Sequence, residues 1–452
     1  MMKLNRQVSI PIFIIISFVL FLLPHSGSSF SPSSESLLGS PGNDRSYAVI
    51  IDAGSSGSRI HVYCFDQNMN LVKIGNEVDF YIQTKPGLSA YESNPELAAE
   101  SLSSMLQQAE GFVPKELHSE TPVRLGATAG LRLLKGDAPE RILEAVRNFL
   151  KEKSPFKYKP EWVTVLKGSE EGSYLWETAN YLEGNLGKEV SRIGGVVDLG
   201  GGSVGWLMLF RRSIFAKAPK PSDGEEPYVK ELFFKGSKYY LYVHSYLHYG
   251  LLAARAEILK AVKGYGNPCI LKDYHGFYKY GGETYEVSAS PSGSNLYRCR
   301  RAALKALKVN ESTCPNLNCT FGGIWNGGGG PGQKNLFVAS FFFDRASQVG
   351  FIDPKLPAAT VRPVDFERAA KRACIVKFET AKYVFPGVGV DDLPYICMDL
   401  VYQFTLLVDG FGLDPQKEIT LVTGFNYLGS QIGAAWPLGS AIEVLSSSSS
   451  PA

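Results

Sequence analysis

Two short apolar stretches that end in an acidic residue stand out in the hydrophobic pattern of this chain. Residues 47–51 and 195–197 have the composition of buried strands, and each run leads to an aspartate, Asp52 or Asp198. A turn of small residues follows each aspartate. The two copies lie about one domain length apart, as expected if two similar halves face each other across a cleft. Because an ordinary hairpin turn has the same local pattern, the prediction depends on the pair.

The rest of the pattern mixes strands and helices. Further strands are predicted at 60–65, at 123–127, at 162–166 and at 239–248. Helices are predicted from Asn94, from Asp137, from a cap at Ser169 and over about 251–262. The apolar run 336–343 is expected in the core, and the small residues around Trp436 suit a seam between domains. Residues 264–332 show no clear period and are expected to be irregular.

Length and composition place the chain among globular proteins with two domains. Its 452 residues exceed the usual size of one hydrophobic core. Hydrophobic residues make up 44% and charged residues 20%, which excludes a disordered chain and a protein with many membrane spans. The net charge of +2 provides no basic field, so nucleic acid is not expected as a partner.

The first residues have the layout of a secretory signal peptide. Lys3 and Arg6 precede the apolar run 10–23, and Pro24 and small residues follow it. We expect a cleaved signal over 1–29, a linker over 30–44 and a polar tail over 446–452, in a secreted or extracellular protein. An uncleaved signal anchor is the alternative. It would hold the protein to a membrane in the lumen of the secretory pathway, such as the Golgi.

Cysteine usage fits an exported protein. Six cysteines lie in one half of the chain and suggest three disulfide bonds, although counting alone leaves their pairing open. A zinc site formed by these cysteines is the alternative to disulfide bonds, but the sequence has no Cys-x-x-Cys pair. Cys64 stands apart in a strand pattern and is expected to be a buried apolar residue. Asn310 and Asn318 begin glycosylation sequons, which are expected at the surface. The six cysteines are Cys269, Cys299, Cys314, Cys319, Cys374 and Cys397.

The small-residue turns after Asp52 and Asp198 are suited to binding phosphate. Without bulky side chains, a phosphate can reach backbone N–H groups in such a turn. An aspartate facing the same phosphate would repel it unless a divalent cation lies between them, bound directly or through water. The pattern therefore predicts a site for a metal ion and a phosphate. The glycine-rich stretch 326–332 is not a Walker motif, and His244 with His248 lacks a third metal ligand, so neither is assigned a ligand.

Five segments of the chain, taken in order, resemble the motifs of the apyrases, the nucleoside triphosphate diphosphohydrolases, and most of all those of the plant type. These segments are Asp52–Arg59, Gly126–Leu134, Lys167–Glu183, Gly195–Gly205 and Gly424–Glu443. The resemblance implies an α/β fold of two actin-like domains, each ribonuclease H-like, with a nucleotide and Ca²⁺ or Mg²⁺ in the cleft between them. Domain I would span 45–167, with 426–445 returning to it, and domain II, which carries the disulfides, would span 168–425.

The resemblance also implies a role for each residue of the site. Asp52 and Asp198 would orient metal-bound waters. Thr128, Glu171 and Ser203 would position the attacking water, with Glu171 as the general base. The phosphate-binding residues would be Ser55, Ser56, Gly57, Ser58, Arg59, Gly200, Gly201, Gly202 and Ser203. The implied disulfides join Cys269 to Cys299, Cys314 to Cys319 and Cys374 to Cys397.

The activity that the resemblance implies is metal-assisted hydrolysis, by a monomer, of terminal phosphates from ATP and ADP to AMP and phosphate. One departure from the family is Gly205, where a glutamine usually helps to hold the attacking water, and residues 427–433 also differ. Loss of that contact motivates an alternative, a nucleotide- or glycan-binding protein with weak turnover. A relative of the sugar kinases or polyphosphatases is a third hypothesis, which the export signal and the cysteines oppose.

Overall fold

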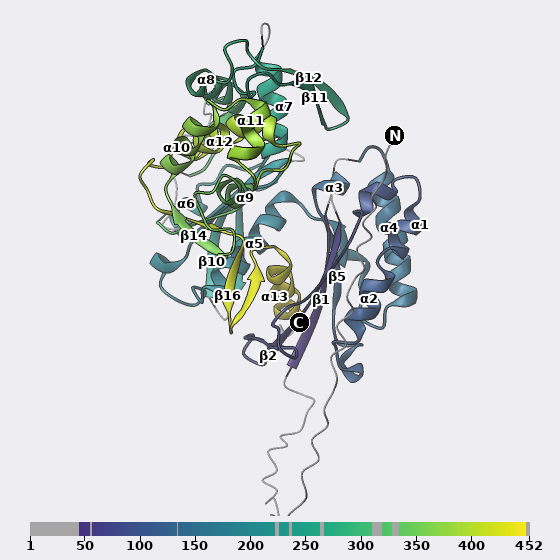
Figure 1. The fold of residues 1–452 in the computed structure, drawn as a ribbon. Coiled ribbons are helices and arrows are strands. Elements are labelled where there is room, and N and C mark those ends of the chain that lie inside the picture. The colour runs from purple at the N-terminus through teal and green to yellow at the C-terminus, as the bar shows by residue number, and fades with distance from the viewer. Residues whose placement is uncertain are drawn as a thin grey trace, which may run out of the picture. The chain divides into compact units, whose positions relative to one another are not determined.

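Two β-sheets form the framework of the described chain (Figure 1). The computed structural model describes residues 45–54, 57–132, 134–221, 226–234, 237–262, 266–309, 319–327 and 334–448. The first sheet has the order β3-β2-β1-β5-β6, with β4 paired to β2. Its strands are β1 (Arg45–Ala53), β2 (Ser58–Asp66), β3 (Leu71–Val72), β4 (Phe80–Thr84), β5 (Val123–Ala127) and β6 (Val163–Val165).

The second sheet has the order β14-β15-β13-β7-β8-β10-β9. Its strands are β7 (Gly195–Leu199), β8 (Ser203–Leu209), β9 (Val229–Phe234), β10 (Ser237–Leu247), β13 (Leu336–Ser340), β14 (Ala358–Val361) and β15 (Ile419–Val422). Two separate hairpins consist of β11 (His275–Tyr280) with β12 (Glu283–Ser288) and of β16 (Gly424–Tyr427) with β17 (Ser430–Gly433). In each sheet, the strand that carries the acidic residue pairs antiparallel with the next strand and parallel with a later one.

Helices cover both sheets, and none of those described is long and apolar enough to span a membrane. Four lie along the first part of the chain: α1 (Pro95–Glu100), α2 (Ser103–Glu110), α3 (Ala129–Arg132) and α4 (Ala138–Lys153). The others are α5 (Gly168–Leu182), α6 (Arg212–Phe215), α7 (Leu251–Ala261), α8 (Leu296–Leu307), α9 (Phe341–Gln348), α10 (Pro363–Ala373), α11 (Phe378–Val384), α12 (Ile396–Thr405) and α13 (Pro437–Ser448). Residues 446–448, which were assigned to the polar tail, extend α13.

Helices α5 and α13 form a layer that both sheets share. Alternate residues of a strand point to opposite faces. On β1, Val49 and Ile51 pack with α1, α2 and α4, whereas Ala48 and Ile50 pack with α5 and α13. On the second sheet, Val196 and Leu207 join this same cluster, while the opposite face packs against α7–α10 and α12. The apolar contacts between the two sheets therefore pass through α5 and α13.

The backbones of α5 and α13 come into direct contact where they cross. A Cβ added to Gly439 would overlap the carbonyl oxygen of Tyr174 and lie 2.7 Å from its Cα. The Gly439 N–H donates to the hydroxyl of Thr178 at 3.0 Å. Glycine is required at this position because the atoms it faces belong to a helix backbone that cannot move aside.

The predicted helix from Asn94 is two helices, α1 and α2. The hydroxyl of Ser101 donates to the Ala98 carbonyl at 2.6 Å. The Leu102 N–H then bonds to Ala99, three residues back, at 3.1 Å, so the α-helical pattern is interrupted. Leu102 nevertheless stays buried with the apolar face that was predicted.

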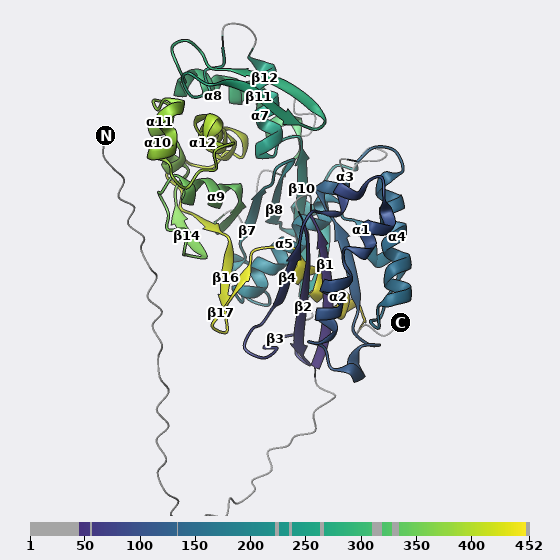
Figure 2. The same cartoon turned by 45° about the vertical axis from the view of Figure 1, so that its right-hand side comes forward.

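Two further local predictions were wrong. Lys167, rather than Ser169, caps α5, and the Glu170 carboxylate accepts a hydrogen bond from the Lys167 N–H at 2.9 Å. The stretch 264–332 is not irregular, because it contains β11, β12 and α8. Figure 2 shows the β11–β12 hairpin beside α7, where the Tyr278 hydroxyl donates to the Leu252 carbonyl at 2.7 Å.

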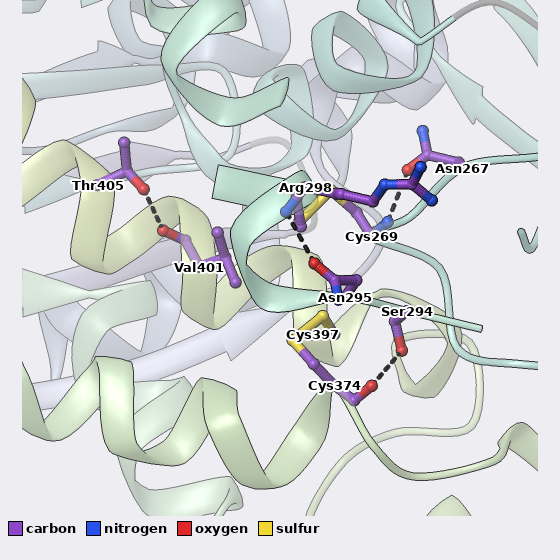
Figure 3. The surroundings of a disulfide bond; sticks show 10 residues. Asn267, Cys269, Ser294, Asn295, Arg298, Cys374, Cys397, Val401 and Thr405 are labelled. Carbon is purple, nitrogen blue, oxygen red and sulfur yellow. Dashed lines mark hydrogen bonds between the residues drawn. A yellow bond between two sulfur atoms is a disulfide. The ribbon is translucent and has the colours of Figure 1, made fainter. Parts of the chain in front are cut away.

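Two of the predicted disulfides are confirmed, Cys269 with Cys299 and Cys374 with Cys397. Figure 3 shows the second bond beside Ser294, whose hydroxyl donates to the Cys374 carbonyl at 2.8 Å. The first bond ties α8 to the loop after α7, and the second ties the end of α10 to α12.

The remaining cysteines divide between described and undescribed residues. Cys319 is disulfide-bonded, whereas Cys314 lies outside the described residues, as do Asn310 and Asn318 of the two sequons. Cys64 is a buried free thiol on β2, as predicted.

We expect Gly439→Ala to lower the free energy of unfolding by about 1–3 kcal/mol, because the new methyl group must separate α5 from α13. Thermal or denaturant unfolding measures this change. Gly433→Ala is the matched control, since a Cβ there meets no atom within 4 Å. Equal stability of the two variants would contradict the close crossing.

Candidate functional site

The two predicted aspartates lie at the ends of corresponding strands. Asp52 on β1 is in register with Arg59 on β2 and Gly126 on β5. Asp198 on β7 is in register with Gly205 on β8 and Ala339 on β13. Burial raises the pKa of both carboxyl groups. Each aspartate is thus a partly desolvated acid at the point where its strand leads into a small-residue loop.

Glu171, in the first turn of α5, completes a group of three acidic side chains. Its pKa is raised to about 7, chiefly by burial and also by the charges of Asp198 and Asp52, while the guanidinium of Arg132 acts in the opposite direction. The Nη2 of Arg132 lies 2.5 Å from Glu171 Oε2. The three carboxylates therefore share one electrostatic environment, which supports the predicted pairing of the two loops.

A hollow of about 150 Å³ lies beside Glu171 and Asp198. The carboxylates of these residues, the guanidinium of Arg132 and the hydroxyl of Ser245 provide its polar lining. Small residues complete the wall, namely Gly168, Gly172, Gly200, Gly201, Gly202, Ser203 and Gly205. The predicted base, one predicted metal-site acid and the second predicted phosphate loop are thus brought together.

Hydrogen bonds fix the backbone of the second loop in one orientation. The carbonyls of Gly200, Gly201 and Gly202 accept from the N–H groups of Leu251, of Leu252 and Ala253, and of His248, respectively. The N–H groups of Gly201 and Gly202 make no hydrogen bond within the described part of the chain. Free N–H groups beside a hollow are suited to bind a phosphate.

The first loop is described only in part. Gly54 N–H donates to the Gly57 carbonyl at 3.0 Å, whereas Ser55 and Ser56 lie outside the described residues. The hydroxyl of Ser58 is buried and has no hydrogen-bond partner among the described residues. A buried hydroxyl without a partner is costly, and an anionic oxygen in this loop would satisfy it.

Arg59 and Thr128 lie close to the Asp52 strand end. Arg59 Nη1 is 3.3 Å from Asp52 Oδ2, so this predicted phosphate ligand forms an ion pair with the predicted metal-site acid. Thr128 directly follows β5, as predicted, and its N–H donates to the Ala53 carbonyl at 3.1 Å. Its side chain is mostly buried and is not among the residues lining the hollow.

The donor set fits a divalent cation held through water and phosphate. Within the described residues, no three carboxylate, imidazole or thiol side chains lie close enough to hold a metal ion by themselves. Two buried carboxylates at strand ends that lead into the predicted phosphate loops are suited to Ca²⁺ or Mg²⁺, which bind oxygen and, in the case of Mg²⁺, keep several waters. Asp52 and Asp198 are therefore the residues that would hold such an ion.

Three polar residues that sequence reasoning did not assign to the site support the acids. Ser340, at a strained φ of 60°, donates its hydroxyl to Asp198 Oδ1 at 2.6 Å. Trp436 Nε1 donates to Asp52 Oδ1 at 3.2 Å. Arg132 lies in the Gly126–Leu134 segment, and the resemblance of that segment to a family motif was a signal that could have assigned Arg132 to the site. Nothing in the sequence pointed to Ser340.

His244 and His248, to which no ligand was assigned, lie among aromatic side chains and in a turn. Among the described residues, no cluster of metal-binding side chains contains them. His244 stacks on Tyr228 and contacts Tyr246 edge-on, while His248 has a positive φ of 72° in the turn before α7. Both histidines therefore have structural surroundings.

Comparison with known proteins agrees with this arrangement. Residues 40–450 match the GDA1/CD39 (nucleoside phosphatase) family. Probable apyrase 2 of Oryza sativa subsp. japonica is 57% identical over 433 residues, which cover 96% of this chain and 92% of that protein. The nucleoside-triphosphatase of Pisum sativum is 52% identical, with 89% of this chain and 88% of that protein covered.

A solved structure of nucleoside triphosphate hydrolases from Neospora caninum shares the fold. Its TM-score is 0.61 at 12% sequence identity, and the match covers 89% of this chain and 93% of that one. This likeness agrees with the predicted mixed α/β fold. The family match and the plant relatives together establish that the chain belongs to the GDA1/CD39 family of nucleoside phosphatases.

Proposed function

We propose that this protein hydrolyses the terminal phosphates of nucleoside tri- and diphosphates, from ATP to ADP and from ADP to AMP, with release of phosphate. The observation that carries this proposal is the hollow in which Glu171, Asp198 and the second glycine loop meet. It combines a carboxylate whose pKa is about 7 with unpaired N–H groups that suit a phosphate. The activities named for the plant relatives agree with it.

In this proposal the two loops bind the phosphates of the nucleotide. The N–H groups of Gly201 and Gly202 and the hydroxyl of Ser203 approach from the second loop, and Gly57, Ser58 and the serines before them approach from the first. A Ca²⁺ or Mg²⁺ ion near Asp52 and Asp198, when bound, neutralises phosphate charge and holds ordered water. Thr128 lies beside Asp52 and helps to fix that strand end.

Glu171 takes the proton of the attacking water. As the water oxygen bonds to the terminal phosphorus, the bond from that phosphorus to the bridging oxygen breaks and the shortened nucleotide leaves. The proton stays on the Glu171 carboxylate until it passes to solvent. Arg132 holds the carboxylate in place, and its positive charge keeps the pKa of Glu171 from rising further, so that the base form is available near neutral pH.

The setting of the protein follows from the same sequence features. We infer secretion, or retention in the secretory pathway through an uncleaved N-terminal segment, because of the signal-like residues before Asp44 and the disulfide bonds. The two sheets and the packing of α13 against β1 support domain boundaries at 45–167 with 426–445, and at 168–425. Fractionation of the tagged full chain tests the localisation.

We expect Glu171→Gln to reduce phosphate release from both ATP and ADP by about 10²- to 10⁴-fold, because a neutral amide cannot accept the proton. Phosphate release from purified protein measures this. Glu170→Gln is the matched control, since the neighbouring acid bonds the Lys167 N–H instead of lining the hollow. Full activity of Glu171→Gln would remove the base from the proposal.

The nucleotide-binding alternative has a test of its own. Binding of a non-hydrolysable ATP analogue by the unaltered protein, without release of phosphate from ATP or ADP, would favour that alternative.

The rate of hydrolysis should rise with pH through about 7, because Glu171 acts as a base only when it has lost its proton. Arg132→Leu removes the charge that lowers the pKa of Glu171, so the acidic limb of the pH–kcat profile should move to higher pH. Arg141→Leu, on the exposed face of α4, is the control. If the acidic limb of the profile has the same midpoint in Arg132→Leu as in the parent protein, a group other than Glu171 determines it.

Removal of divalent cations by a chelator should abolish phosphate release, and Ca²⁺ or Mg²⁺ should restore it. Asp198→Asn should require about 10- to 100-fold more cation for half-maximal activity, as is typical when a group holding metal-bound water is lost. Titration of activity with each cation measures this. An activity that persists in chelator would exclude a cation-dependent reaction.

A further inference from the structure

Ser245 belongs to a row of three residues that crosses the second sheet. Asp198 on β7 is in register with Gly205 on β8, and Gly205 is in register with Ser245 on β10. Directly paired residues of antiparallel strands present their side chains on the same face. Asp198 and Ser245 therefore flank a position at which the sheet has no side chain.

The N-terminal part of α5 covers this row at close range. A Cβ added to Gly168 would overlap the Cβ and hydroxyl of Ser245, and one added to Gly172 would lie 2.9 Å from Leu207 Cδ1. These two contacts place the turn of α5 that carries Glu171 over β8 and β10. The space above Gly205 remains open as the hollow between Glu171, Asp198 and Ser245.

The contents of this hollow are determined by its size and lining. Its volume of about 150 Å³ exceeds the roughly 30 Å³ share of one water molecule, so several waters fit. An ordered water needs two to four polar partners, which the two carboxylates and the Ser245 hydroxyl provide. That hydroxyl makes no hydrogen bond to another residue in the described chain, so it is available to water. Asp198, by contrast, already accepts from Ser340.

We propose that Ser245 holds the attacking water together with Glu171, an inference that rests on the proposed function. The water gives one hydrogen to the Glu171 carboxylate and donates the other in a hydrogen bond to Ser245 Oγ, so a lone pair of its oxygen faces the terminal phosphorus. As the new P–O bond forms, the bond to the bridging oxygen breaks and the nucleoside diphosphate or monophosphate leaves. The transferred proton remains on Glu171, so atoms and charge balance.

The absence of a side chain at Gly205 leaves room for this role of Ser245. Without a side chain at 205, Ser203 and Ser245 are the described residues of β8 and β10 that bring a hydroxyl to the lining of the hollow. In the proposed function the Ser203 hydroxyl binds phosphate, so the Ser245 hydroxyl is the one left for the water. A side chain fits at 205, because an added Cβ would lie 3.7 Å from Leu207 Cδ1 and 3.9 Å from Asp198 Cβ, which are ordinary contact distances. A polar side chain introduced at position 205 can therefore make the contact with the water that is assigned here to Ser245.

The first test is Ser245→Ala. We expect kcat for ATP hydrolysis to fall about 10- to 100-fold, because a water with one partner is poorly oriented. KM for ATP should stay within about twofold, since both phosphate loops are intact. Ser347→Ala, which alters a half-buried serine of α9 that does not line the hollow, is the matched control. Ser245→Cys, which keeps the size of the side chain but is a weaker acceptor, should lower kcat in the same way and replaces Ser245→Ala if that variant fails to fold.

The second test is rescue from position 205. In the Ser245→Ala background, Gly205→Gln should restore kcat at least fivefold, because its amide enters the same hollow, whereas Gly205→Ala should restore nothing. An unchanged kcat in Ser245→Ala, with an active parent protein, would overturn the role of Ser245 and leave the proposed function standing. A hundredfold rise in kcat from Gly205→Gln in the parent protein, with Ser245 intact, would also overturn the role of Ser245. Such a rise would mean that Ser245 does not hold the attacking water in the parent protein. A parent protein that releases no phosphate would instead refute the proposed function.

Discussion

The site depends on holding three carboxylates away from bulk water, two of them beside one small hollow. Burial raises the pKa of Asp52, Asp198 and Glu171, and the first two acids raise that of the third. Such an arrangement is unfavourable unless donors compensate it. The donors come from separate elements. They are Arg59 on β2, Arg132 at the end of α3, Ser340 at the end of β13 and Trp436 before α13. The group is therefore assembled only when both sheets and the C-terminal helix are packed.

The same electrostatics couple the ligands to each other. Three carboxylates repel a bare phosphate, whereas free N–H groups of the second loop and the buried hydroxyl of Ser58 attract it. A divalent cation would reduce the repulsion between the carboxylates and the phosphate, so that the hydrogen-bond donors can bind the phosphate. The cation and the polyphosphate should therefore each bind more tightly when the other is present. The cation neutralises the carboxylates that repel the phosphate, and the phosphate accepts hydrogen bonds from donors that the cation leaves unpaired.

Helix α5 has a structural role and, in the proposed function, a chemical one. It carries Glu171 at its start, and it lies in the apolar layer that both sheets share. Close approaches at Gly168, Gly172 and Gly439 hold it against β10, β8 and α13 in turn. A helix fixed by backbone-level contacts on three sides keeps the carboxylate of its first turn in a constant position. Precise placement of this kind is what a general base requires.

The sequence by itself determined the strand ends at Asp52 and Asp198, because an apolar run followed by an acid and small residues records local chemistry. The family, the α/β class and two disulfide pairings followed from the resemblance of its ordered motifs to those of the apyrases. It failed where local patterns were ambiguous. The helix predicted from Asn94 is interrupted at Ser101 and Leu102 although its apolar face continues, and the hairpin and helix within 264–332 give weak periodic signals.

Only the tertiary structure decided which residues surround the acids. Arg132, Ser245, Ser340 and Trp436 are separated in sequence by tens to hundreds of residues from the carboxylates they approach, and strand register, rather than composition, sets them side by side. The raised pKa of Glu171 likewise depends on burial and on charges from two other strands. Desolvation and long-range proximity are properties of the packed chain, so no local stretch of sequence can specify them.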